Sequence, residues 1–139
     1  MKLIKYLLIV LTTVIFSNKL LIPMDLTQSD HLKAYGIVFW NLQKGRDVDW
    51  LLNYRDGSFM MDSHQEIKTE CLIRGVQFET IDANQYGTIL STINDNNMDI
   101  ALLETVPKIA VYTPSGKQPW DDAVTLALTY AEIDYDKIF

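Results

Sequence analysis

The sequence predicts an α/β fold with a parallel, doubly wound sheet. From Lys19 onward, short β-rich runs alternate with longer helical patterns, and turn or capping residues separate them. The 139 residues, 48% of them hydrophobic, match the size of one ordinary domain. The 6 Gly, 4 Pro and 1 Cys exclude collagenous, low-complexity and disulfide-stapled chains. Acidic residues outnumber basic ones by 18 to 12, so we do not expect nucleic acid as a partner.

The first seventeen residues have the layout of a secretory signal peptide. Lys2 and Lys5 precede an apolar run from Tyr6 to Phe16, and Ser17 follows that run. The run is shorter than the roughly 20 apolar residues that a membrane-spanning helix needs. We therefore expect residues 1–17 to be removed on export to the periplasm or the extracellular space, which leaves no membrane span. The alternatives are an uncleaved membrane anchor and a buried N-terminal helix.

The first strand and helix of the exported part are expected between residues 19 and 45. The strand is the apolar run KLLIPMD, which ends at Asp25. Ser29 or Asp30 can cap the helix in HLKAYGIVFWNLQKG, and Gly45 is placed to end it. Apolar residues at spacings i, i+3, i+4 and i+7 form the predicted buried face of this helix: Leu32, Tyr35, Gly36 and Phe39.

A second strand and helix follow. The strand VDWLLNY leads into the turn signal Asp56-Gly57. A helix is expected to begin at Ser63, which can form a capping box with Glu66, and to end at Gly75. A loop is expected from Asn53 to Ser58, and the residues from there to Ser63 are assigned to no strand or helix.

The third strand is expected in VQFETI, which ends at Ile81. Asp82 can cap the helix that follows, whose apolar residues again have helical spacing. The segment Met98 to Val106 is ambiguous, a short mixed segment that ends at Pro107.

The pattern starts again after Pro107, which predicts a domain boundary there. KIAVYTP is a strand, a helix runs from about Trp120 to Ile133, and YDKIF is a last strand. That helix is apolar on most sides, so we expect it to be buried between layers. We interpret residues 18–106 as a first α/β domain and 107–139 as the incomplete start of a second one, because a terminal parallel strand leaves an exposed edge. The alternative is one complete five-stranded domain.

Candidate binding residues are expected in the loops after the strands, because ligands of open parallel sheets lie at the carboxyl ends of the strands. The loop from Thr113 to Asp122 is the richest, since it offers hydroxyls, a lysine, a tryptophan and two carboxylates. Each of these loop residues can instead serve as a helix cap or turn residue. The candidates are Thr113, Ser115, Lys117, Trp120, Asp121, Asp25, Asp30 and Arg55.

No catalytic, metal or cofactor site is predicted. A phosphate loop at SGK is excluded, because Val111 and Gln118 stand where the motif needs a glycine and a hydroxyl. A calcium loop at Asp95 is excluded, because Ile100 takes the place of the turn glycine. The two histidines lack zinc-ligand spacing. Cys71 falls on the apolar stripe of the second helix and is interpreted as a core residue.

Two segments, IPMDLTQSDHLKAYGIVFWNLQKGRDVDWLLNYRDGSF and KIAVYTPSGKQPWDDAVTLALTYAEIDYD, resemble the start of a family of exported bacterial proteins often labelled asparagine synthetase B. The resemblance runs from about Leu21 to the end of the chain. It implies a flavodoxin-like first domain and a second domain similar to class I glutamine amidotransferases. Residues 107–139 would then be the opening strand and helix of that second domain.

The label implies glutamine-dependent asparagine synthetase activity. The chain has neither a cysteine directly after Met1 nor an S-G-G-x-D-S loop, so no catalytic residue is carried over. We expect a binding or scaffold role for this portion, with an unidentified small molecule or protein as its partner. The alternative is amidotransferase-like or asparagine synthetase activity with catalytic residues beyond Phe139, for which the loop from Thr113 to Asp122 would form one wall of the pocket.

Overall fold

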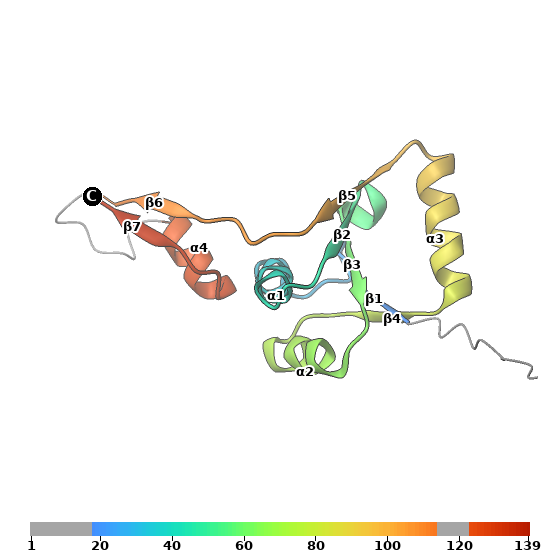
Figure 1. The fold of residues 1–139 in the computed structure, drawn as a ribbon, viewed down its shortest axis with the longest axis horizontal. Helices are drawn as coiled ribbons and strands as arrows, with labels where there is room; N and C mark the ends of the chain where they lie inside the picture. The colour runs from blue at the N-terminus through green and yellow to red at the C-terminus, as the bar shows by residue number, and fades with distance from the viewer. Residues whose placement is uncertain (1–17, 114–122) are drawn as a thin grey trace, which may run out of the picture.

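The computed structural model describes residues 18–113 and 123–139, and these form two sheets and their covering helices (Figure 1). The strands are β1 (Lys19–Ile22), β2 (Val48–Leu52), β3 (Phe59–Asp62), β4 (Glu79–Ile81), β5 (Asp99–Leu103), β6 (Ala110–Tyr112) and β7 (Asp136–Ile138). The helices are α1 (His31–Gln43), α2 (Gln65–Arg74), α3 (Ala83–Asp95) and α4 (Ala123–Ala131), with a short 3-10 turn, η1 (Tyr54–Asp56). Five strands form one sheet in the order β4-β1-β3-β2-β5, and β6 pairs with β7 in the other.

The five-stranded sheet is antiparallel, so the predicted parallel, doubly wound, flavodoxin-like sheet is wrong. Each neighbouring pair, β4 with β1, β1 with β3, β3 with β2 and β2 with β5, runs antiparallel. The cause is the strand β3, which lies in residues that the sequence analysis assigns to no strand or helix. Because β2 and β3 form a hairpin, β4 runs opposite to its expected direction, and β5 runs in the same direction as β4.

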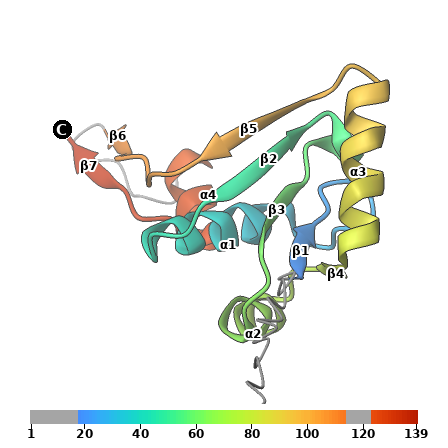
Figure 2. The same ribbon diagram turned by 45° about the vertical axis from the view of Figure 1, so that its right-hand side comes forward.

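The connections explain how helices and an antiparallel sheet alternate along the chain. β1 and β2 run in the same direction with β3 between them, and α1 joins them. In the same way α2 joins β3 to β4, with β1 between these strands. This β-α-β-β-α-β order is the ferredoxin-like arrangement. After it, α3 crosses the sheet to β5 at the opposite edge (Figure 2).

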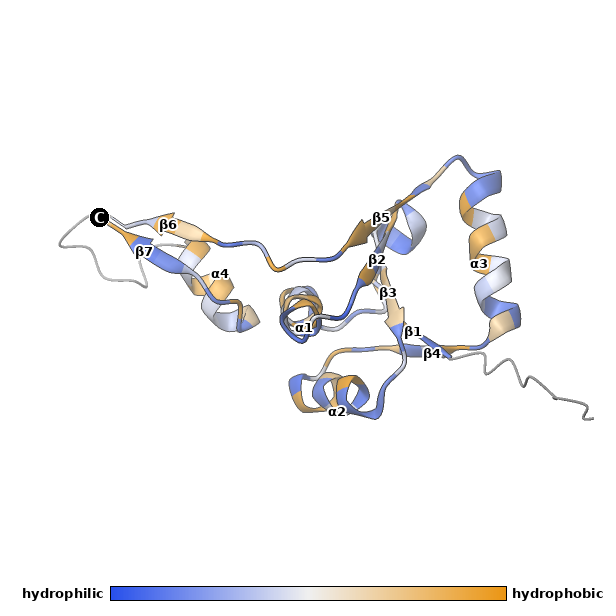
Figure 3. Ribbon diagram, in the orientation of Figure 1, coloured by the Kyte–Doolittle hydropathy of each residue, from blue (hydrophilic) through white to orange (hydrophobic). Residues whose placement is uncertain are grey.

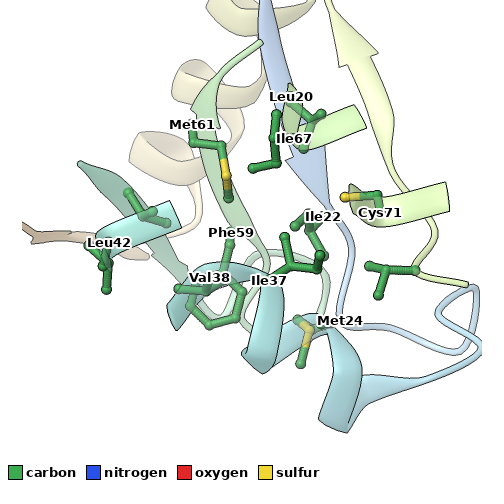
Figure 4. Close-up of a cluster of buried hydrophobic side chains, with 13 residues drawn as sticks. Leu20, Ile22, Met24, Ile37, Val38, Leu42, Phe59, Met61, Ile67 and Cys71 are labelled. Carbon is green, nitrogen blue, oxygen red and sulfur yellow. The ribbon is translucent and has the colours of Figure 1, made fainter. Parts of the chain in front are cut away.

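The sheet separates two apolar layers, and β1 contributes to both. Leu20 and Ile22 belong to the cluster with α1 and α2, whereas Leu21 belongs to the cluster with α3. This is the alternation expected of a strand covered on both faces. Figure 4 shows the first cluster, in which Cys71 is fully buried as predicted.

Helix α1 is buried over more of its surface than the sequence predicts. Two residues of the predicted apolar face, Leu32 and Tyr35, are exposed, while Ile37 and Val38 are buried. The reason is that α1 lies between the sheet on one side and α4 on the other (Figure 1). Figure 3 shows both polar and apolar colouring on α1, α2 and α3.

Several predicted helix ends are confirmed. Asp30 caps α1 by accepting the Lys33 N–H at 2.9 Å. Asp82 and Gln85 form a capping box at the start of α3, with hydrogen bonds of 2.8 and 2.9 Å. Gly75 ends α2 with φ of 72°, a left-handed conformation that glycine adopts without strain.

The predicted capping box of α2 is wrong. The helix begins after His64, so Ser63 lies one residue too early, and His64 makes no side-chain capping bond. Glu66 instead accepts a hydrogen bond from Arg46 Nη2 at 2.6 Å. A tertiary ion pair therefore takes the carboxylate that the local motif would have used.

The smaller sheet is a β6-α4-β7 unit with parallel strands, and both predicted strands are confirmed. The predicted burial of α4 on most sides is wrong, because Val124, Leu126 and Tyr130 are about half exposed. The helix packs against α1 along one side, where Gly36 lets the backbones approach so closely that a Cβ there would overlap Ala131 O.

Polar contacts at both ends of α1 reinforce this packing. At the start of α1, Tyr130 donates its hydroxyl to Asp30 Oδ2, and Lys33 pairs with Glu132 at 2.6 Å. At the end of α1, the side chains of Gln43 and Asp134 are hydrogen bonded at 2.7 Å.

Residues 1–17, which carry the predicted signal peptide, lie outside the described residues. Within 18–113 and 123–139, every helix is too short or too polar to cross a bilayer. The division at residue 107 stays a prediction.

Candidate functional site: a polar cleft at one end of the sheet

Two of the predicted binding residues, Asp25 and Arg55, are in contact. Arg55 donates Nε to Asp25 Oδ2 at 2.6 Å, Nη1 to Glu79 Oε1 at 2.7 Å and Nη2 to Thr27 Oγ1 at 3.1 Å. They meet because β1 and β2 run in the same direction, so both strands finish at the same end of the sheet. Each of the three nitrogens of the guanidinium is thus hydrogen bonded to the protein itself. This cluster therefore holds neighbouring loop residues together and does not form an open binding site.

The Arg55 cluster also holds an unusual backbone. Asn53, Arg55 and Asp56 all have positive φ, at 65°, 46° and 62°. This conformation is uncommon for residues with a side chain and persists where the surroundings enforce it. The hydrogen bonds from Arg55 and Thr27 hold the pKa of Asp25 well below its usual range, and the same pairing with Asp25 raises the pKa of Arg55.

The lowered pKa of Asp25 predicts a pH-dependent contribution to stability. Above about pH 4 the carboxyl is ionised in both the folded and the unfolded chain, so the ion pair contributes fully. As the pH falls below 4, the unfolded chain takes up the proton first and the contribution is lost. Urea unfolding of the wild type and Asp25→Asn should differ by about 1–3 kcal/mol at pH 7, and by less at pH 3. A difference that stays constant between these pH values would contradict the assignment.

The remaining predicted residues do not join this cluster. Asp30 caps α1 and contacts Tyr130; burial raises its pKa, but the bonds from Tyr130 and from the Lys33 N–H outweigh burial and lower it. Thr113 follows β6 in the smaller sheet and donates its N–H to Ile138 O at 2.8 Å. The other four predicted residues lie outside the described residues: Ser115, Lys117, Trp120 and Asp121.

A polar cleft of about 470 Å³ opens at the opposite end of the sheet from Arg55. It forms because the pairing of β2 with β3 stops at Asp49 and Met60. Beyond that point β3 continues beside β1 and β2 continues beside β5, so the two strands separate (Figure 2). We call this cavity the polar cleft; its polar lining residues are Lys19, Asn41, Arg46, Asp47, Asp49, Asp62 and His64.

The wall of the polar cleft contains a buried acceptor and a buried donor without partners. Asn41, on α1, is 1% exposed; its Nδ2 donates to Arg46 O at 3.3 Å, and its Oδ1 has no hydrogen-bond partner among the described residues. A flipped amide would bring Asn41 Oδ1 against Arg46 O, and two acceptor oxygens cannot form a hydrogen bond. The orientation of the amide is therefore fixed. Arg46 uses Nη2 for Glu66, while its buried Nη1 is likewise unpartnered in the described chain. Each such group costs about 1–3 kcal/mol when left unpaired.

The charges of the polar cleft are unevenly compensated. Lys19 Nζ pairs with Asp62 at 2.8 Å; burial lowers the pKa of Lys19, but the bond to Asp62 and the charge of Asp49 outweigh burial and raise it. The carboxylate of Asp49 has no hydrogen bond within the described part of the chain. Burial raises the pKa of Asp49, Lys19 opposes this rise, and the charges of Asp62 and Asp47 add to it.

A second, apolar cleft of about 400 Å³ lies between α1, β2 and the segment 105–109. Trp50 stacks on Phe59 there, with ring centroids 5.9 Å apart, and Tyr35 meets Phe59 edge-on. The indole of Trp50 donates to Gly57 O at 3.0 Å. The lining is almost entirely apolar, so this cleft offers few groups that would orient a polar molecule.

The described residues provide little for catalysis or metal binding. Burial raises the pKa of the Cys71 thiol to about 12, which leaves it protonated and poorly nucleophilic at neutral pH. The ring of His31 is hydrogen bonded to Met24 O at 3.0 Å. Within 18–113 and 123–139, no group of three or more His, Cys, Asp or Glu side chains is placed to hold a metal ion.

Comparison with protein-family models, curated proteins and solved structures finds no match to this chain. The resemblance to the exported family therefore stays a prediction, and the geometry of the site carries the functional argument.

The residues of the polar cleft were not among those predicted from the sequence. Asn41 had a usable signal, because it lies seven residues after Ala34 and four after Ile37, both of which are buried on α1. A polar residue at such a position needs a partner or a ligand. Arg46 and Asp49 had no comparable signal, since only the separation of β2 from β3 brings them to one cavity.

Proposed function

We propose that this chain is a binding module of an exported protein and that the polar cleft takes a small polar molecule. The observation that carries the proposal is the pair of buried, unpartnered atoms in its wall, Asn41 Oδ1 and Arg46 Nη1. A ligand that donates to the first atom and accepts from the second satisfies both, which gives binding a favourable contribution that the free protein lacks. The volume of the cleft is in the range of small-molecule sites.

The position of the polar cleft also supports a binding role. Asn41 is held by α1 and by its own bond to Arg46 O, while Lys19 and Asp62 are fixed to each other across two paired strands. Sites built on helices and strands keep their geometry better than sites on loops. Export is supported by the charged start and apolar run of residues 1–17.

The proposal is tested by screening small polar compounds against the full ¹⁵N-labelled chain by NMR. Compounds that bind are expected to shift the NMR signals of the backbone amides of Asn41, Arg46 and Asp49. Arg46→Ala should lower the affinity for these compounds about tenfold, through loss of one charge-assisted hydrogen bond. Lys44→Ala is the matched control, because Lys44 also pairs with Glu66 and lies outside the polar cleft.

Two results would contradict the proposal. One is that no compound shifts these amides at millimolar concentration. The other is that binding is weakened equally by Arg46→Ala and Lys44→Ala, which would mean that the loss of the pairing with Glu66, and not the free Nη1 of Arg46, explains the effect.

A further inference from the structure

The outer side of β5 is an open edge of the five-stranded sheet. Among the described strands β5 pairs with β2 alone, and Figure 2 shows it along one side of the sheet. Natural edge strands are usually very short, or are blocked by lysine, proline or a bulge, because an open edge can pair with another chain. β5 has the sequence DIALL and a continuous ladder with β2, so it carries none of these protections. We call its outer side the β5 edge.

The backbone groups of Ile100 and Leu102 point to the β5 edge. Leu51 donates its N–H to Ser58 O at 2.8 Å, so the backbone groups of Leu51 face β3. Residues of an antiparallel ladder alternate in direction, so Ile100, which lies opposite Leu51, directs its own groups away from β2, as does Leu102. Ile100 N–H is hydrogen bonded to the side chain of Asp99 at 2.8 Å, whereas Leu102 N–H has no partner in the described part of the chain.

Apolar surface is exposed on both faces of the sheet beside the β5 edge. On the α3 face, Leu102 is 55% exposed and lies next to Ile100, which packs against the second apolar cluster. On the α1 face, Trp50 is 37% exposed and lies opposite Ala101 of β5. A strand added at the β5 edge would therefore gain apolar contacts as well as backbone hydrogen bonds.

We propose that the β5 edge pairs with β5 of a second copy of this chain, in antiparallel fashion about a twofold axis. When all five residues are paired, Ala101 lies opposite Ala101 of the second copy, Ile100 opposite Leu102, and Asp99 opposite Leu103. Ile100 and Leu102 then exchange backbone hydrogen bonds across the axis. No charged residue of β5 lies opposite a like charge, and the exposed Leu102 side chain packs on Ile100 of the second copy. This pairing does not depend on the proposed function.

The other strand edges are less suited to a second copy. β7 paired with itself over its full length would place Lys137 opposite Lys137, and like charges directly opposite are destabilising. β4 and β6 have three residues each, so they offer fewer backbone groups than β5. In β4, moreover, the Glu79 side chain is already held by Arg55 at 2.7 Å.

The test measures the mass of the full chain by analytical ultracentrifugation from about 10 to 500 μM, a range that suits a weak interface. The mass is expected to rise from one chain to two. The rise should occur at lower protein concentration when salt is added, because salt screens the repulsion between copies of net charge -6. In hydrogen exchange, the Leu102 amide should become protected only at high concentration, whereas the Ala101 amide, which faces β2, should be protected throughout.

Two substitutions at exposed Leu102 test the β5 edge without removing a core side chain. Leu102→Lys places a charge opposite Ile100 of the second copy, and Leu102→Pro removes an N–H that the ladder with β2 does not use. Each should weaken the dimer at least about tenfold and leave the circular dichroism unchanged. Leu72→Lys is the matched control, because Leu72 is 70% exposed on α2, and this change should leave the dimer intact.

Three results would overturn the proposal. The first is a chain that stays monomeric over the whole range. The second is growth beyond two copies, because pairing about a twofold axis closes at the dimer. The third is a dimer that Leu102→Lys affects no more than Leu72→Lys does, which would assign the association to another surface.

Discussion

Leu20→Ala is expected to lower the free energy of unfolding by about 2–5 kcal/mol. Leu20 is fully buried on β1, between its neighbours β3 and β4, and its side chain belongs to the cluster that joins the sheet to α1 and α2. Truncation removes apolar contacts with two helices at once and leaves a cavity that a central strand cannot close by moving. Urea unfolding followed by circular dichroism measures the change.

The matched control is Leu26→Ala. Leu26 is the same residue type, is 100% exposed and lies in the loop before α1. This substitution should change stability by no more than about 0.5 kcal/mol. Similar losses at Leu20 and Leu26 would show that the first apolar cluster does not hold the layers together as described.

Gly36→Ala is expected to destabilise the protein by about 1–3 kcal/mol, because the new Cβ would overlap Ala131 O and force α4 away from α1. Helix propensity alone predicts the opposite sign, since alanine is favoured over glycine inside a helix by about 1 kcal/mol. The two effects therefore compete at one residue, and the unfolding free energy decides between them. The contact of Tyr130 with Asp30 should be lost as well, which NMR shifts of these residues would report.

Gly87→Ala supplies the comparison, because Gly87 lies within α3 and a Cβ there would meet no atom within 4 Å. Its expected effect is a stabilisation of about 0.5–1 kcal/mol. If Gly36→Ala were also stabilising, the close packing of α1 against α4 would be wrong.

Local sequence signals predicted the helices and most strands, but the direction of the strands depended on one short element. Three buried residues make up most of strand β3: Phe59, Met60 and Met61. In the sequence, however, they follow a turn signal directly and a helix begins a few residues later. Their apolar character fits either a strand or a loop that is packed inward. Without β3, the alternation of strands and helices predicts a parallel sheet. With β3 inserted, the same alternation gives an antiparallel sheet.

The candidate site was predictable only in part for the same reason. The rule that ligands lie at the carboxyl ends of strands applies to parallel sheets. It brought Asp25 and Arg55 together correctly, because β1 and β2 happen to share a direction, but these residues neutralise each other. The polar cleft lies at the other end, where strands of both directions meet and where Asn41 of α1 is the one residue that its own helix pattern marks as unusual.

The packing of α4 against α1 has a consequence for the cooperativity of unfolding. Its contacts fall at both ends of α1, through Asp30 and Lys33 at the start and Gln43 at the end, with Gly36 between them. Because the smaller sheet and α4 are attached at three points along helix α1, no single hinge allows them to rotate away from it. Loosening the smaller sheet therefore breaks the Tyr130–Asp30 contact, the Lys33–Glu132 ion pair and the close backbone contact at Gly36 together, so the two sheets should melt in one shared transition.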